Sequence, residues 1–152
     1  MMISSQDYHW AKKQTQFMED YLGVNSIVDD VSQTTVTGSG SIFNGIASLT
    51  LNPPFANYTD TISAKANAEV AFVGNIGDAA VNKNNSSYLT TFLGFPLEAL
   101  SNNDRKTIMQ KFLDKCQQTT TPSPGGIINN NYKRQRSCDT NNQNNTNWWR
   151  HN

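Results

Sequence analysis

The stretch that decides the fold is Tyr88–Gly94, which reads Tyr-Leu-Thr-Thr-Phe-Leu-Gly. β-Branched, aromatic and aliphatic residues fill it and a glycine ends it, which is the pattern of a buried strand. A second run of this kind, Glu69–Gly74, precedes it, and we interpret residues 75–87 between them as a loop. The two runs predict the centre of a β-sheet.

Two helical patterns flank the predicted strands. Apolar residues recur at three- and four-residue spacings from Tyr8 onward, and Gly23 can end such a pattern, so we expect a helix from about Gln6 to Leu22. A second helix is predicted after Ser101, because Asp104 follows at capping-box spacing. Its apolar stripe consists of Ile108, Met109, Phe112, Leu113 and Cys116.

Shorter strands complete the body of the chain. Met1 to Ser4 is an apolar run that ends at a polar turn, and Ser4 with Asp7 would cap the first helix. We expect further short strands at Val24 to Val31 and Thr34 to Gly38, and a hairpin partner within Ile42 to Leu51. This order of elements predicts an α/β fold, a partial doubly wound sheet with an inserted β-hairpin region and a C-terminal helix.

Composition divides the chain into a body and a tail. Residues 1–116 hold nearly all the large aliphatic side chains, so we expect one α/β domain there, as the later part of a larger domain. Residues 117–126 predict a Thr/Pro/Gly linker, and residues 127–152 predict an Asn-rich disordered tail. We expect Cys116 and Cys138 to be unpaired thiols, because their spacing matches no common cysteine motif.

The charge balance argues against a polyanionic partner. Twelve Lys and Arg balance twelve Asp and Glu, so the formal net charge is zero and we expect no nucleic acid partner. No apolar run is long enough for a membrane span, and the first residues do not resemble a signal peptide. No cluster of side chains predicts a metal ion or another cofactor.

Two segments together resemble a known family. They are Ile3–Asp7, which reads Ile-Ser-Ser-Gln-Asp, and Phe92–Leu100, which contains Gly-Phe-Pro-Leu-Glu-Ala-Leu. Over residues 1–116 the chain resembles the later half of a class I glutamine amidotransferase-like domain, a flavodoxin-like α/β domain. The resemblance is to the degenerate type that is attached to secreted bacterial hydrolases and peptidases. It implies a sharp strand-to-helix elbow at the first segment and a strand that leads into a final helix at the second.

The resemblance also has consequences for catalysis. Active members of that class place a cysteine at the elbow and a His-Pro-Glu sequence at the start of a late helix. This chain has Ser4 and Ser5 at the elbow and Phe95–Glu98 in place of the second motif, so it lacks both the thiol and the imidazole. We therefore expect no catalytic residue. Ser5, Gln6, Asn75 and Glu98 would follow strand ends, where open α/β sheets bind ligands, and are the candidate ligand-binding residues.

Three functions remain open from the sequence. The first is a non-catalytic accessory, scaffold or interaction domain, a fragment of a larger secreted bacterial protein whose other domains are its partners. The second is a degenerate amidotransferase-like hydrolase that uses Ser5 or Glu98 and is completed by upstream sequence. The third is a carbohydrate- or surface-binding module that uses Tyr88, Trp148 and Trp149. The very short first strand favours the first function, because an exposed strand edge invites association.

Overall fold

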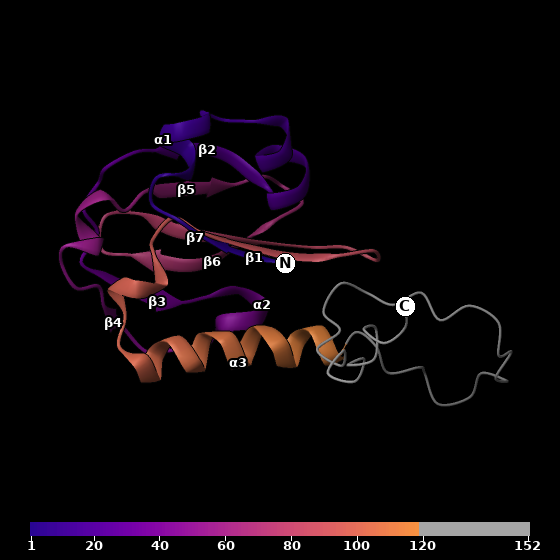
Figure 1. Ribbon diagram of the computed structural model, residues 1–152. Coiled ribbons are helices and arrows are strands. Elements are labelled where there is room, and N and C mark those ends of the chain that lie inside the picture. The colour runs from indigo at the N-terminus through magenta and orange to yellow at the C-terminus, as the bar shows by residue number, and fades with distance from the viewer. Residues whose placement is uncertain (119–152) are drawn as a thin grey trace, which may run out of the picture.

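A computed structural model of the chain describes residues 1–118. Figure 1 shows that they form three layers, with a β-sheet in the middle and smaller elements on both of its faces. The α/β class with a C-terminal helix is therefore confirmed. The Asn-rich tail and the expected linker from residue 119 onward lie outside the described residues. Among residues 1–118, no helix is long and apolar enough to cross a membrane.

The middle layer is a six-stranded sheet with the order β1-β8-β7-β6-β3-β4. Its strands are β1 (Met2–Ser4), β3 (Thr35–Gly38), β4 (Leu49–Thr50), β6 (Glu69–Gly74), β7 (Asp78–Asn84) and β8 (Leu89–Leu93). β1 and β8 are parallel, with Met2 opposite Thr91, and all other neighbouring pairs are antiparallel. Parallel pairing is thus confined to one edge of the sheet.

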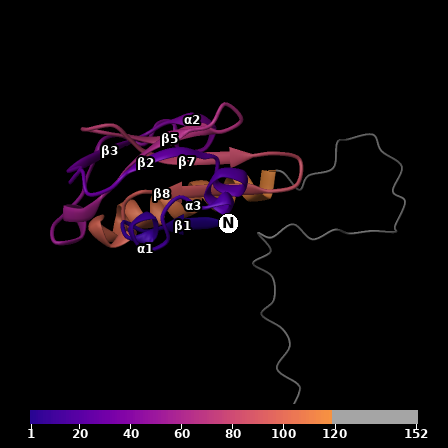
Figure 2. The same cartoon turned by 90° about the horizontal axis from the view of Figure 1, so that it is seen from above.

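Smaller elements cover both faces of the sheet. On one face lie α1 (Tyr8–Lys12), the π-helical turn η1 (Met18–Leu22) and an antiparallel ribbon of β2 (Val24–Val28) and β5 (Thr61–Ala64). On the other face lie α2 (Gly40–Phe43) and α3 (Asn102–Gln118). Figure 2, seen from the ribbon side, shows α3 behind the sheet. Two 3-10 turns, η2 (Phe55–Tyr58) and η3 (Leu97–Ala99), lie in the connections.

The hydrophobic core occupies both faces of the sheet. In β8, Leu93 packs in the cluster on the α3 side, whereas the preceding Phe92 packs in the cluster that η1 and β2 form. Phe72 lies at the centre of the α3-side cluster, where its ring centroid is 4.8 Å from that of Phe43 and 5.6 Å from that of Phe95. Because both faces of β8 are buried, its sequence is a continuous apolar run instead of an alternating one.

The most regular patterns predicted their elements correctly. The strands expected at Glu69–Gly74 and Tyr88–Gly94 are β6 and β8, and the short strands expected near the N-terminus are β1, β2 and β3. The capping box of α3 is confirmed as well. Ser101 Oγ lies 2.6 Å from an Asp104 carboxylate oxygen and accepts the Asp104 N–H at 3.2 Å.

The apolar stripe of α3 is confirmed in its main part. Ile108, Phe112 and Cys116 are buried in the core, whereas Met109 is 40% exposed. Cys116 is disulfide-bonded, so the expectation of an unpaired thiol is wrong for this residue. Spacing along the sequence was a poor guide, because it does not determine which thiols meet in space. Cys138 lies outside the described residues.

The single helix expected over Gln6 to Leu22 is wrong. The chain forms the two short pieces α1 and η1, which are separated where Lys13 adopts a left-handed φ of 57°. That conformation interrupts a right-handed helix. The expected cap is also absent, because Asp7 makes no capping side-chain hydrogen bond and Ser4 bonds elsewhere. Gly23 does end η1 in the left-handed conformation, with φ of 80°.

The loop expected at residues 75–87 contains β7, a strand in the interior of the sheet. Its polar side chains are buried and have partners inside the protein. Asn82 Oδ1 accepts the Thr91 hydroxyl at 2.7 Å, and Lys83 Nζ donates to the Asp20 carbonyl at 2.6 Å. Polar residues are tolerated inside a sheet when they are hydrogen-bonded in this way, but a pattern of apolar residues does not reveal them.

The hairpin partner expected within Ile42 to Leu51 is only partly correct. Leu49 and Thr50 form β4, which pairs with β3, but Ile42 and Phe43 belong to α2. Gly40 starts that turn with a φ of 65°, and a Cβ there would lie 2.6 Å from the Val70 carbonyl oxygen. The short strand β5 had no counterpart among the predictions.

Candidate functional site

Three strands end at one edge of the central sheet. β1 and β8 are parallel, and β6 shares their direction because β7 is antiparallel to both β6 and β8. Ser5 and Gln6 follow β1, Gly94 follows β8, and Asn75 follows β6. This carboxyl edge, defined by the residues that follow β1, β6 and β8, is the place where open α/β sheets bind ligands.

Ser5 and Gln6 form the turn that leaves β1. The Ser5 N–H donates to the Leu93 carbonyl at 3.2 Å, and its Oγ accepts the Asp7 N–H at 3.2 Å. Gln6 Oε1 is buried and has no hydrogen-bond partner among the described residues. The turn thus contains one hydroxyl that is engaged locally and one buried amide oxygen that lacks a donor.

Asn75 and Glu98 are positioned by other contacts. Asn75 Oδ1 accepts the N–H groups of Thr34 and Thr35 at 2.8 and 3.1 Å, which fastens the start of β3 to the end of β6. Glu98 lies exposed in η3, and the described residues contain no hydrogen-bond partner for its carboxylate. Within residues 1–118, no hydrogen bond joins either residue to Ser5. Of the four candidates, only Ser5 and its neighbour Gln6 lie together through the chain itself.

Asp60 is the strongest electrostatic feature near this edge, although no pattern in the sequence indicated it. Its N–H donates to the Gly94 carbonyl at 2.7 Å, which places it beside the end of β8. The side chain is fully buried, with Oδ1 accepting the Asp30 N–H at 3.2 Å and Oδ2 without a partner. Burial, followed by repulsion from the carboxylates of Asp29, Asp30 and Asp7, raises the pKa of Asp60 to about 8 against the effect of the Asp30 hydrogen bond.

Gln33 holds Asp60 from the loop before β3. Its side chain is fully buried; Nε2 donates to the Asp60 carbonyl at 2.8 Å, and its N–H donates to Thr59 Oγ1 at 2.6 Å. Gln33 Oε1 is buried without a partner. The amide fits there only because residue 74 is a glycine, since a Cβ at Gly74 would lie 1.5 Å from Gln33 Oε1. The described residues thus include three buried side-chain oxygens that lack donors, on Gln6, Gln33 and Asp60.

A histidine lies beside the acidic residues and not beside the elbow hydroxyls. His9 Nδ1 is 2.5 Å from Asp29 Oδ1, so the carboxylate orients the imidazole. No hydrogen bond joins His9 to Ser5 within the described residues, and the Ser5 hydroxyl accepts from Asp7 instead. The structure therefore contains a histidine–carboxylate pair, but the serine that would complete a triad is not bonded to it.

Ser4 links the two segments that carry the family resemblance. Its Oγ donates to the Phe95 carbonyl at 3.0 Å and accepts the Leu97 N–H at 2.8 Å. Only a hydroxyl can both donate and accept at a single atom, so a serine suits this position. Ser4 positions the chain after β8 and is engaged structurally.

A second surface with binding chemistry lies on η1 and the start of β8. Phe17, Tyr21 and Tyr88 form an aromatic row, in which successive ring centroids are 5.6 and 5.7 Å apart. Phe17 is 37% exposed and Tyr21 is 52% exposed. The Tyr88 hydroxyl donates to the Asp20 carbonyl at 3.0 Å, which fixes its ring next to η1. We refer to these three residues as the aromatic row.

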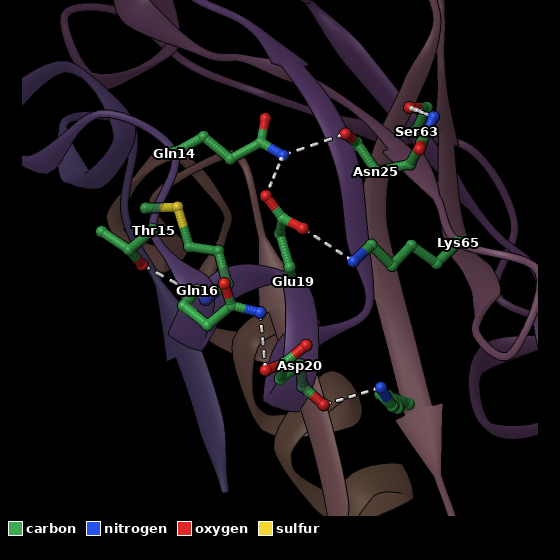
Figure 3. A network of polar contacts seen from close by, with 10 residues as sticks. Gln14, Thr15, Gln16, Glu19, Asp20, Asn25, Ser63 and Lys65 are labelled. Atoms are coloured by element: carbon green, nitrogen blue, oxygen red, sulfur yellow. Dashed lines mark hydrogen bonds and ion pairs between the residues drawn. The ribbon is translucent and has the colours of Figure 1, made fainter.

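A polar network borders the aromatic row, and Figure 3 shows it from close by. Glu19 accepts hydrogen bonds from Lys65 Nζ at 2.8 Å and from Gln14 Nε2 at 3.0 Å, and these bonds hold the pKa of Glu19 below its usual value. Gln16 Nε2 donates to the Asp20 carboxylate at 2.8 Å. Charged and amide groups therefore lie along η1 next to exposed rings.

Comparisons with known proteins do not assign the chain to a family. No protein-family model matches it, and no curated protein matches it at a significant level. Within residues 1–118, no group of three or more His, Cys, Asp or Glu side chains could hold a metal ion.

Proposed function

We propose that this chain is a non-catalytic interaction domain of a longer exported polypeptide, and that a neighbouring part of that polypeptide docks on the free edge of β1. One observation carries the proposal. All five residues of β8 are buried, whereas the three residues of the adjoining β1 are all half-buried. Strands in a parallel sheet are normally buried on both faces. The half-burial of the apolar Met2 and Ile3 therefore suits a strand that gains a further neighbour.

The backbone of β1 offers hydrogen bonds on its free side. The Met1 carbonyl and the Ser5 N–H both bond to β8, at 3.0 and 3.2 Å. Because parallel pairing uses alternate residues of a strand, Met2 and Ser4 direct their N–H and carbonyl groups away from β8. No charged residue or proline protects this edge, although edge strands commonly carry one. An added parallel strand would satisfy these four backbone groups.

The resemblance to the later half of an amidotransferase-like domain supports the same proposal. A doubly wound domain carries βα units on both sides of its first strand. Units that precede Met2–Ser4 in a longer polypeptide would lie on the free side of β1. The partner we propose is therefore a strand of the same polypeptide, and the domain's role is structural association.

The experiment compares this 152-residue chain with a protein that also contains the in-frame upstream coding sequence. We expect hydrogen exchange at the Ser4 amide to slow and the free energy of unfolding to rise in the longer protein. Met2→Pro removes an outward N–H without touching the bonds to β8, so it should abolish the gain in unfolding free energy. Met2→Ala is the matched control, because it keeps the N–H. Absence of upstream coding sequence, or unchanged exchange at Ser4, would overturn the proposal.

One observation favours the alternative of a degenerate hydrolase. The His9–Asp29 pair provides an oriented imidazole four residues after Ser5. A fluorophosphonate probe tests whether a rearrangement activates that serine. Covalent labelling that disappears in Ser5→Ala would support a hydrolase, whereas an unlabelled folded protein would count against it.

A further inference from the structure

We infer that the aromatic row of Phe17, Tyr21 and Tyr88 is a binding platform for an uncharged glycan chain. Three aromatic rings in a continuous exposed row are unusual on a soluble surface, because exposed apolar patches generally mark binding sites. The inference concerns a different surface from the free edge of β1, since the row lies on η1 and the start of β8.

The chemistry of the row suits pyranose rings. A sugar ring presents C–H groups on its faces, and these pack against the electron-rich face of an aromatic ring. Successive ring centroids in the row are 5.6 and 5.7 Å apart, comparable to the length of one pyranose unit. An extended glycan could therefore place consecutive sugar units over consecutive rings.

The hydroxyl groups of such a glycan also need hydrogen-bond partners. Gln16 and the Asp20 carboxylate lie beside Tyr21 at the same turn, and they are bonded to each other at 2.8 Å across an exposed contact. Together they offer amide and carboxylate groups of the kinds that bond vicinal hydroxyls. Aromatic stacking flanked by a few placed polar groups is the general design of a small-molecule site.

The local charge argues for an uncharged ligand. Glu19 and Asp20 are balanced by Lys65 and Lys83, which bond to the Glu19 carboxylate and the Asp20 carbonyl. A single-stranded nucleic acid would also stack on aromatic rings, but it requires a positively charged groove for its phosphates. Two carboxylates beside the rings leave no such groove. The charge pattern therefore favours a neutral glycan over a polyanion.

The row is held in place before any ligand binds. The Tyr88 hydroxyl donates to the Asp20 carbonyl at 3.0 Å, and Thr90 Oγ1 donates to the Tyr21 carbonyl at 2.6 Å. These bonds tie the end of η1 to β8. A platform that is already ordered loses less conformational entropy on binding, which favours measurable affinity.

The test is calorimetric titration of the 152-residue protein with soluble β-linked oligosaccharides, namely the hexamers of glucose, xylose, mannose and N-acetylglucosamine. We expect saturable binding to at least one of them. Tyr21→Ala should weaken it about tenfold, as expected for the loss of one ring contact. Tyr21→Phe should retain most of the affinity. Tyr58→Ala is the matched control, because Tyr58 is 53% exposed but lies in η2, away from the row.

Two outcomes would overturn the inference. One is the absence of binding to all four oligosaccharides by a protein whose circular dichroism shows it to be folded. The other is binding that Tyr21→Ala leaves unchanged, or that is weaker than binding to oligo(dT). Met2→Pro should not alter the glycan affinity, so failure of the platform and failure of the β1 docking edge are distinguishable.

Discussion

Asp60 should make this domain less stable as the pH rises through neutrality. In the folded chain its buried carboxyl has a pKa of about 8, whereas an unfolded aspartate titrates near about 3.9. Between these values the folded state keeps a proton that the unfolded state has released. The stability associated with protonated Asp60 is therefore fully present below about pH 4 and is lost as the pH rises toward the folded pKa.

The expected magnitude follows from proton linkage. One proton bound more tightly in the folded state lowers the free energy of unfolding by about 1.4 kcal/mol for each pH unit between the two pKa values. Between pH 5 and pH 7 the loss is on the order of 3 kcal/mol, a large part of the stability of a domain of this size. Replacement by Asn removes the titration but keeps the shape and an acceptor for the Asp30 N–H.

The assay is urea denaturation of wild type and Asp60→Asn at several values between about pH 4.5 and pH 8.5. The Asn variant should gain stability relative to wild type by about 1.4 kcal/mol per pH unit up to the folded pKa. Contributions from other carboxylates, such as the hydrogen-bonded Glu19, are common to both proteins and cancel. Glu98→Gln is the control, because this exposed carboxylate should leave the profile of wild type unchanged. Parallel pH profiles for wild type and Asp60→Asn would refute the reasoning.

Two further predictions concern the core and the last helix. Phe72→Ala empties a fully buried site between Phe43 and Phe95 and should lower the free energy of unfolding by about 3 to 5 kcal/mol; a urea midpoint near that of wild type would contradict the assigned packing. Ser101→Ala removes the cap of α3 and should cost about 1 kcal/mol in the same assay, whereas Ser101→Asp, which can still accept the Asp104 N–H, should cost less.

The elements that the sequence predicted well are those in which local pattern and burial agree. β8 and β6 are apolar runs that end in glycine, and the stripe of α3 follows a capping box that the structure contains. The first helical pattern failed because its aromatic residues do not face a core. Trp10 is 63% exposed, and α1 buries no residue at all. Periodicity cannot distinguish such a surface pattern from an amphipathic helix.

The candidate site divides in the same way. The position of Ser5 and Gln6 after β1 could be predicted, because a short apolar run that stops at a polar turn indicates a strand end. The role of Asp60 could not be predicted, because it depends on contacts with Gly94 and Asp30, which are distant in the sequence. The aromatic row likewise depends on the approach of η1 to Tyr88, for which the sequence offered only a single tyrosine.

The unpaired oxygens near Asp60 and its raised pKa explain each other. A buried carboxylate needs donors, but Asp60 has only the Asp30 N–H on Oδ1, and its neighbour Gln33 contributes a buried oxygen that itself lacks a donor. A neutral carboxyl resolves the conflict, because its O–H group changes Oδ2 from an unsatisfied acceptor into a donor. Burial thus favours the protonated form for a second reason besides the cost of desolvating a charge. The side-chain amide that Asp60→Asn introduces would supply the same donor permanently, which is why this substitution should stabilise the domain above neutral pH.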